Sequence, residues 1–304
     1  MSEGIDVNER GAVRGPEHVT RPLRWSLRRE IWENRSIYLA PAAVAALVLF
    51  ASLMISLGLP GRLRAYEASQ DPSKGHSLIQ VFSMAPSPIM LATFIVGLFY
   101  ALDALYGERR DRSILFWKSL PVSDATTVFA KALIPLAVLP VIALVLSIFA
   151  QVVLLIASSA WLMLNGLSPA ALWRELHFFE NLMIMPYGLA VHSLWFAPIY
   201  AWLLFLSGWA KRAPFLWAVI PVLIVAALER IMFNSWHFLS ALQYRVGGAM
   251  SAAFDFRPGE GDIDRLAQLQ PARFLSTPGL WVGLLVAAAL LAATVRLRRT
   301  REPV

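Results

Sequence analysis

The chain has 304 residues, of which 58% are hydrophobic and only 15% are charged, and its mean hydropathy is +0.58. Soluble domains average about a quarter charged residues, so the composition excludes an ordinary soluble protein. The sequence has no cysteine, which excludes a disulfide framework and thiolate chemistry. The apolar residues are collected into runs that approach or exceed the roughly 20 residues needed to cross a bilayer, which predicts an all-α membrane protein.

The charged N-terminal region, residues 1–36, ends in the segment PLRWSLRREIWENR, residues 22–35. Its apolar side chains fall on two stripes of a helix, formed by Leu23, Leu27 and Ile31 and by Trp25 and Trp32. Arg29, Glu30 and Glu33 occupy the opposite arc. This pattern predicts a helix lying in the membrane interface, with its tryptophans at headgroup depth.

Residues 37–304 are expected to form a single transmembrane domain. Its predicted spans are about residues 37–58, 86–106, 127–155, 183–209, 214–233 and 278–295. The third run stays apolar to about Leu164, which gives roughly 57 Å of helix at 1.5 Å per residue. It could be one long helix or two helices joined by a tight turn.

Charge favours one long third helix. With six spans and both termini in the cytosol, the whole net charge of +7 lies on the inside, as the positive-inside rule favours. Seven spans would put Lys211, Arg212 and the basic tail outside. We therefore expect one long helix bent at Pro135 or Pro140.

Two segments outside the spans have structure of their own. Between the second and third spans, GERRDRSILFWKSLPVSD, residues 107–124, is first charged and then apolar and aromatic. It predicts a short cytosolic helix with Ser113 as N-cap, ended by Pro121, after which Ser123 caps the next helix. Between the fifth and sixth spans, the amphipathic stretch NSWHFLSALQYRV, residues 234–246, predicts a helix on the outer surface.

Sequence motifs for catalysis are absent. The chain has no P-loop, no H-E-x-x-H, no G-x-S-x-G and no pair of acids within one apolar run. We therefore expect no enzyme active site, no metal site and no bound cofactor in this chain. His192, near the middle of the fourth run, is expected to be a neutral imidazole bonded to a neighbouring helix.

Residues 106–131, YGERRDRSILFWKSLPVSDATTVFAK, strongly resemble the coupling-helix region of ABC-2 type permease subunits of ATP-binding cassette transporters. The interfacial helix, the six spans and the outer helical segment agree with that family. The resemblance implies a dimer, of two copies or of this chain with a related one, in the inner membrane of a bacterium. It also implies two separate ATPase subunits, which bind ATP and Mg²⁺. Membrane lipids are also expected as binding partners, and no nucleic-acid partner is predicted.

The resemblance assigns roles to individual residues. The groove of the ATPase would be contacted by Glu108, Arg109, Arg110, Asp111, Ser113, Phe116 and Trp117. The second and fifth spans would line the substrate pathway. On the second span, Thr93, Gly97, Tyr100 and Asp103 share one face, and we assign the first three to the pathway. The alternative for this face is a helix–helix contact through small residues.

Asp103 and Lys131 lie at similar depth on the two helices that the coupling segment joins, so we predict an ion pair between them. Because few charges line any span, the expected substrate is amphipathic or hydrophobic, such as a lipid, a peptide or a drug-like molecule, and export is the family's usual direction. The alternatives are an ion-coupled secondary transporter, which would favour charges at mid-depth, and a membrane-embedded enzyme acting on lipid or peptide.

Overall fold

The computed structural model describes residues 22–69, 79–114, 116, 122–255 and 265–300, and most of these residues are helical. Within this part of the chain, six helical segments are long and apolar enough to cross a membrane. They are Ser36–Ser56, Ile79–Arg110, Asp124–Leu164, Ala170–Trp209, Pro214–Phe233 and Pro278–Thr300. The chain therefore has the helical architecture of a multi-pass membrane protein, as the apolar runs predicted.

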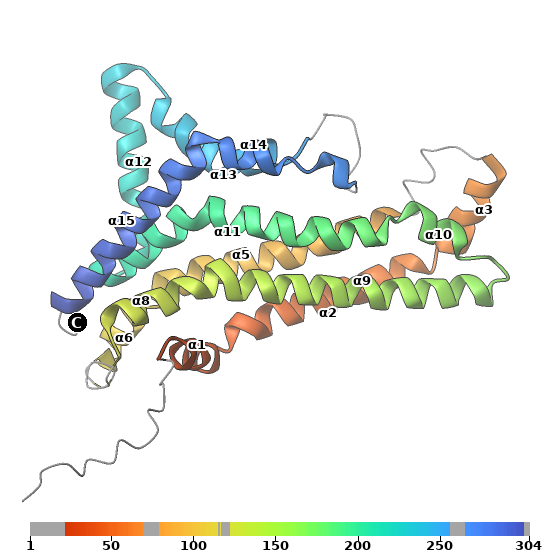
Figure 1. Cartoon of the computed structure of the whole chain (residues 1–304), viewed down its shortest axis with the longest axis horizontal. Coiled ribbons are helices and arrows are strands. Elements are labelled where there is room, and N and C mark those ends of the chain that lie inside the picture. Colours follow the sequence, from red (N-terminus) through yellow and green to blue (C-terminus); the bar gives the residue numbers. More distant parts are fainter. Residues whose placement is uncertain (1–21, 70–78, 115, 117–121, 256–264, 301–304) are drawn as a thin grey trace, which may run out of the picture.

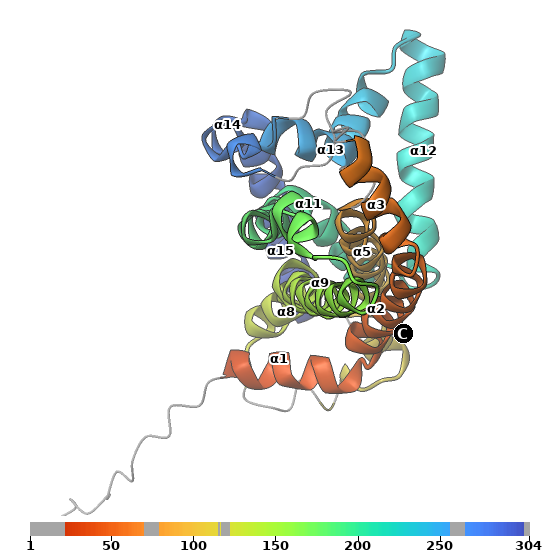
Figure 2. The same ribbon diagram turned by 90° about the vertical axis from the view of Figure 1, so that its right-hand side faces the viewer.

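Four helices form an elongated bundle (Figures 1 and 2). They are α2 (Ser36–Ser56), α5 (Pro86–Asp103), α9 (Leu139–Leu164) and α11 (Phe178–Trp209). A further helix, α15 (Pro278–Thr300), crosses one end of the bundle and packs extensively on α11. Large side chains such as Ile37, Leu139, Trp195 and Tyr200 are almost completely buried between these helices.

The third span is one continuous helical segment, as predicted, and it reaches Leu164 rather than residue 155. It consists of α8 (Asp124–Leu133), a π-helical turn, η1 (Ile134–Val138), and α9. The helix changes to a π-helical turn at Pro135, because proline lacks the N–H group that the α-helical pattern requires at that position. At the other end of α8, the Ser123 hydroxyl accepts a hydrogen bond from the Thr126 N–H at 3.1 Å, which confirms the predicted cap.

Two short helices pack at the far end of the bundle, α3 (Leu59–Ser69) and α10 (Ala170–Glu175) (Figure 1). The buried side chains of Leu59 and Leu63 join those of Leu154, Leu155 and Leu162 in one apolar cluster. One face of this end of α9 is therefore covered by other parts of the chain.

The fifth apolar helix, α12 (Pro214–Phe233), stands across the direction of the bundle in both views (Figures 1 and 2). Only Pro214, at its first position, is buried. Side chains along its whole length, from Phe215 to Phe233, are exposed. Its apolar surface is therefore available to lipid or to another protein chain.

The segment between α12 and α15 contains α13 (His237–Ala253), the 3₁₀ turn η2 (Leu266–Gln268) and α14 (Pro271–Ser276), so the predicted helix is present and longer than expected. Its Arg245 guanidinium donates to the carbonyl oxygens of Trp195 at 3.2 Å and Gly279 at 2.9 Å. A Cβ atom at Gly283 would collide with that guanidinium. Glycine at this position of α15 therefore allows Arg245 to hold α13 against α11 and α15.

Candidate functional site

The helix that precedes the first span is α1 (Pro22–Glu33), and it lies across one end of the bundle (Figure 2). Trp25 and Trp32 are 63% and 64% exposed, whereas Glu30 on the opposite arc is only 1% exposed. The predicted tryptophan stripe is therefore free to contact a membrane interface. The acidic arc, in contrast, packs against the protein itself.

The Glu30 carboxylate connects three helices. One of its oxygens accepts hydrogen bonds from Lys131 Nζ of α8 at 2.8 Å and from Arg29 Nη2 at 2.6 Å. The other accepts a hydrogen bond from the Tyr100 hydroxyl of α5 at 2.7 Å. Since Tyr100 and Lys131 are also buried, these bonds are shielded from water.

A second buried carboxylate, Glu108, extends the network into the segment that links α5 to α8. It belongs to the short helix α6 (Tyr106–Arg110) and lies 3.1 Å from both Lys131 Nζ and Arg29 Nη2. Its other oxygen is 3.4 Å from Arg298 Nη2 of α15, and Arg298 Nε is 3.5 Å from Asp124 Oδ1 of α8. One ion network thus joins α1, α6, α8 and α15, and α5 joins it through Tyr100.

Every charge in the network has at least one partner of opposite sign. Three bases, Arg29, Lys131 and Arg298, face four acids, Glu30, Glu33, Glu108 and Asp124. A buried charge without a partner is costly, so separating any of these helices from the others would be strongly unfavourable. The network therefore makes α6 and the helix ends around it behave as one unit.

The same segment is fixed to α11 by a second set of bonds. The Ser207 hydroxyl accepts hydrogen bonds from the N–H groups of Leu105 and Tyr106, both at 2.9 Å. The buried Arg109 side chain donates to the carbonyl oxygens of Ser207 at 2.7 Å and Ala210 at 2.6 Å. A cation is favourable at these carbonyl groups because they carry the negative end of the α11 dipole.

Acid should weaken the network through Glu30. Burial acts to raise the pKa of this carboxyl group, but Lys131, Arg29 and the Tyr100 hydroxyl outweigh it, and the pKa lies below the ordinary value of 4.5. A depressed pKa contributes stability at pH values above 4.5, which is lost as the pH falls through the folded-state pKa. The advantage of the wild type over Glu30→Gln should thus be constant near neutrality and shrink below pH 4.5. Thermal unfolding of both proteins across this range measures it, and a constant difference down to pH 3 would contradict the charge network.

The predicted ATPase-contact residues separate into two groups. Glu108 and Arg109 are 9% and 3% exposed and bond within the chain, so in this structure they offer little surface to a partner, and their predicted contact with an ATPase stays a prediction. Arg110 and Asp111 have exposed side chains, and Phe116 is 60% exposed. Ser113 is partly buried, and its hydroxyl donates to the Glu108 carbonyl oxygen at 3.4 Å. Trp117, like most of the predicted coupling helix, lies outside the described residues.

The predicted ion pair between Asp103 and Lys131 is wrong. Lys131 pairs with Glu30 and Glu108, whereas the Asp103 side chain is 60% exposed and lies 3.9 Å from Arg110 Nη1. Asp103 is the last residue of α5, and its carboxylate points away from the buried face of that helix. The acids that contact Lys131 are Glu30 and Glu108. They belong to α1, which precedes α5 in the sequence, and to α6, which follows it.

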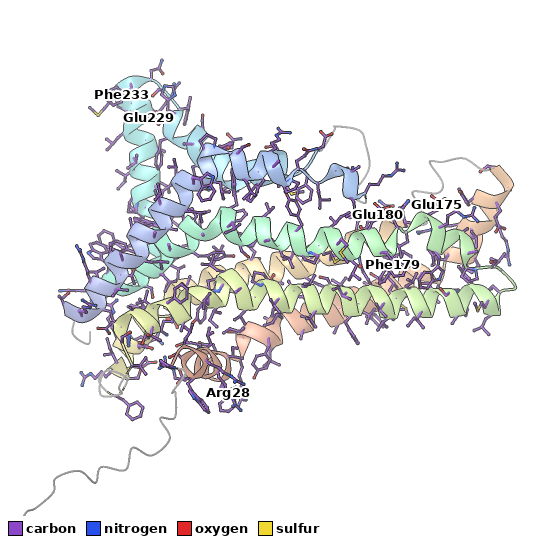
Figure 3. All side chains as sticks on the ribbon, in the orientation of Figure 1. Arg28, Glu175, Phe179, Glu180, Glu229 and Phe233 are labelled. Atoms are coloured by element: carbon purple, nitrogen blue, oxygen red, sulfur yellow. The ribbon has the colours of Figure 1, made fainter. Side chains whose placement is uncertain are left out.

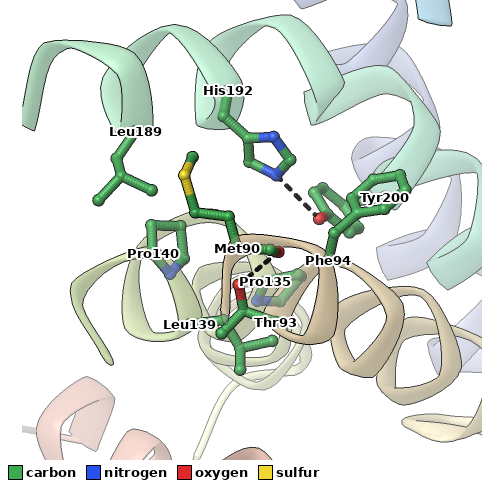
Figure 4. A pocket seen from close by; sticks show the side chains of 9 residues that line it. All are labelled: Met90, Thr93, Phe94, Pro135, Leu139, Pro140, Leu189, His192 and Tyr200. Atoms are coloured by element: carbon green, nitrogen blue, oxygen red, sulfur yellow. Dashed lines mark hydrogen bonds between the residues drawn. The ribbon is translucent and has the colours of Figure 1, made fainter. Parts of the chain in front are cut away.

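The predicted pathway residues lie inside the protomer. Thr93 and Tyr100 are buried, and the Thr93 hydroxyl donates to the Met90 carbonyl oxygen at 2.8 Å (Figure 4). A Cβ at Gly97 would be only 3.1 Å from Tyr200 Cε1. This face therefore makes the helix–helix contact that was the alternative, and its assignment to the substrate pathway stays a prediction.

His192 lies in α11 near this contact. Its Nε2 is 3.2 Å from the Tyr200 hydroxyl, two turns further along the same helix rather than on a neighbouring one (Figure 4). Together with Thr93 and Leu139 they line a small cavity of about 20 Å³. Among the described residues, no group of three or more His, Asp and Glu side chains is arranged to hold a metal ion.

The sequence analysis did not single out Glu30 or Arg298 as functional residues. Glu30 was placed only on the arc of the interfacial helix opposite its apolar stripes, and Arg298 belongs to a tail whose charge fits the positive-inside rule. The signal in the sequence that could have identified Glu30 is its position directly after Arg28 and Arg29, close to the cytosolic boundary where Lys131 was also expected. Comparisons with protein-family models, with curated proteins and with solved structures found no match. Function is therefore inferred from the chain's own residues.

Proposed function

We propose that this chain is the permease subunit of an ATP-binding cassette transporter of the ABC-2 type, and that it exports an amphipathic or hydrophobic substrate. The observation that carries this proposal is the construction of the coupling segment. Its base is fixed to the bundle through Glu108 and Arg109, while Arg110, Asp111 and Phe116 beside them are exposed. If a soluble partner displaces a segment built in this way, the displacement is transmitted to several helices at once.

The proposed partner is a pair of ATPase subunits that bind ATP and Mg²⁺ on the cytosolic face. In the complex, two permease subunits span the inner membrane of a bacterium, with both termini of each in the cytosol. The α1 helix lies on the inner leaflet, with Trp25 and Trp32 among the lipid headgroups. The exposed length of α12 is the surface that lipid or the second permease subunit covers.

Movement reaches the bundle through the ion network. When the ATPase displaces the coupling segment, Glu108 carries Lys131 and Arg298 with it, because separating buried charges would cost several kcal/mol. The ends of α1, α8 and α15 then move together. The π-helical turn at Ile134–Val138 is the flexible point at which this movement passes into α9.

The partner itself is tested by purifying the full chain from native membranes in mild detergent and identifying bound proteins by mass spectrometry. The proposal predicts a soluble protein with a P-loop, in stoichiometric amount, whose ATP hydrolysis changes when the permease is present. A preparation that transports substrate without any such ATPase would favour the ion-coupled alternative.

Phe116 should contribute strongly to the ATPase contact. A large apolar side chain that is 60% exposed beside the charged residues Arg110 and Asp111 resembles the centre of a protein interface. Phe116→Ala should weaken ATPase binding by about 2 kcal/mol, roughly 30-fold in Kd. Phe179, which is 75% exposed at the opposite end of the bundle (Figure 3), provides the control. Equal ATPase affinity for Phe116→Ala and Phe179→Ala would contradict the assignment.

A further inference from the structure

A larger cavity lies under α13, in a part of the bundle away from the ion network. It has a volume of about 430 Å³ and is lined by side chains of α5, α9, α11 and α13. It shares Met90, Leu189 and His192 with the small cavity beside Tyr200 (Figure 4). Cavities of 300–1,000 Å³ are the usual size of small-molecule sites, so a drug-sized molecule fits here.

The walls of this cavity are held in place without a ligand. The Trp195 indole N–H donates to the Arg245 carbonyl oxygen at 2.7 Å, and the Tyr187 hydroxyl donates to the Ala253 carbonyl oxygen at 3.0 Å. These bonds fix both ends of the α13 stretch that covers the cavity. A preformed site loses little conformational entropy when it binds, which favours affinity.

The chemistry of the lining excludes a charged ligand group. No Asp, Glu, Lys or Arg side chain is among the described residues that line the cavity, and most of the lining is apolar. Its polar members include Ser147, Gln151, Asn181 and His192. A charge placed there would lose its hydration without gaining a counter-ion, whereas an uncharged apolar body would be well accommodated.

Ser147 is the residue that points to a polar ligand group. It is 3% exposed, and its hydroxyl has no hydrogen-bond partner among the described residues. One turn further along α9, the Gln151 side-chain N–H donates to the Phe82 carbonyl oxygen at 3.3 Å, which leaves the amide oxygen as an acceptor. A ligand hydroxyl or amide that both donates and accepts would satisfy the two residues together.

We propose that this cavity binds an uncharged amphipathic molecule, with an apolar chain or ring body and a hydroxyl or amide group held by Ser147 and Gln151. Ser147 is 16 residues beyond Lys131, roughly 24 Å along the helix, so it lies in the outer half of the bilayer in the proposed topology. The inference rests on the proposed function in one respect only, namely that the bound molecule is the transported substrate. Binding itself needs neither ATP nor a partner.

The test uses the full chain in lipid nanodiscs and a monoacylglycerol whose acyl chain carries a photoreactive diazirine. We expect adducts on peptides of α9 and α13. Ser147→Ala should raise the half-saturating concentration roughly three- to tenfold. It should leave the thermal stability of the free protein unchanged or higher, because it removes an unpaired hydroxyl. Ser158→Ala is the matched control, since Ser158 on the same helix is equally buried and unpaired but does not line the cavity.

Two outcomes would overturn the proposal. One is equal labelling of the Ser147→Ala, Ser158→Ala and wild-type proteins. The other is equal labelling of the cavity by a phosphatidylcholine with the same diazirine chain, which would show that bulk lipid tails fill it. Neither outcome would affect the ATPase partner, whereas specific binding that ATP hydrolysis never alters would support the cavity and contradict the transporter proposal.

Discussion

Lys131→Met is expected to lower the free energy of unfolding by roughly 3–5 kcal/mol, the typical effect of removing one member of a buried ion pair. The lysine is 2% exposed and neutralises Glu30 and Glu108 at once, so its loss leaves two buried carboxylates with too few cations. Unfolding in mixed detergent micelles, followed by tryptophan fluorescence, measures the change.

The double mutant separates this network from a general loss of packing. Glu30→Gln combined with Lys131→Met should cost less than the sum of the single changes, because each removes the other's unpaired charge. Asp103→Asn is the control, since this carboxylate is 60% exposed and lies outside the network, and the change should alter stability by less than about 0.5 kcal/mol. Strict additivity of Glu30→Gln and Lys131→Met would show that the two side chains do not interact.

Gly97→Leu is expected to destabilise the protein by roughly 1–3 kcal/mol or more, because the core has no space for the added atoms. A Cβ at this position already approaches Tyr200 at 3.1 Å and Leu139 at 3.3 Å. Gly247 in α13 has no neighbour within 4 Å, so Gly247→Ala should instead stabilise its helix by up to about 1 kcal/mol.

The outcome distinguishes a packing role from a pathway role for Gly97. If the residue lined an open pathway, Gly97→Leu would block transport while leaving the thermal stability near that of the wild type. The packing role predicts a lower melting temperature even in the absence of substrate. Measuring the melting temperature of the Gly97 and Gly247 variants side by side therefore decides the point.

The sequence predicted the features that depend on local pattern. Apolar length gave the six candidate spans, charge balance favoured one long third helix, and Ser123 was recognised as a cap from its position before Asp124. The tryptophan stripe of α1 was also identified by helical spacing alone. The apolar runs, the cap and the tryptophan stripe are each determined within a short stretch of chain, where the hydrophobic effect and backbone hydrogen bonding act. The continuity of the third helix was inferred instead from the charges of all the loops together.

The ion network could not be predicted in the same way, because its partners are far apart in the sequence. Glu30 and Lys131 are separated by 101 positions. Helical depth placed Asp103 near Lys131, but depth does not specify which side of α5 faces α8. Tyr100, three positions earlier, occupies the buried side. Likewise, the small face containing Gly97 could contact another helix or line a pathway, and only its approach to Tyr200 distinguishes the two.

The central claim, that ATP hydrolysis on a separate subunit drives movement of an amphipathic molecule through this chain, is tested most directly in inside-out membrane vesicles. The measurement is the fraction of a fluorescent neutral monoacylglycerol that becomes protected from extraction by albumin. We predict that protection requires ATP and the wild-type permease, and that it is abolished when the P-loop lysine of the ATPase is replaced. Protection that persists with the inactive ATPase, or that follows an imposed proton gradient without ATP, would contradict the claim.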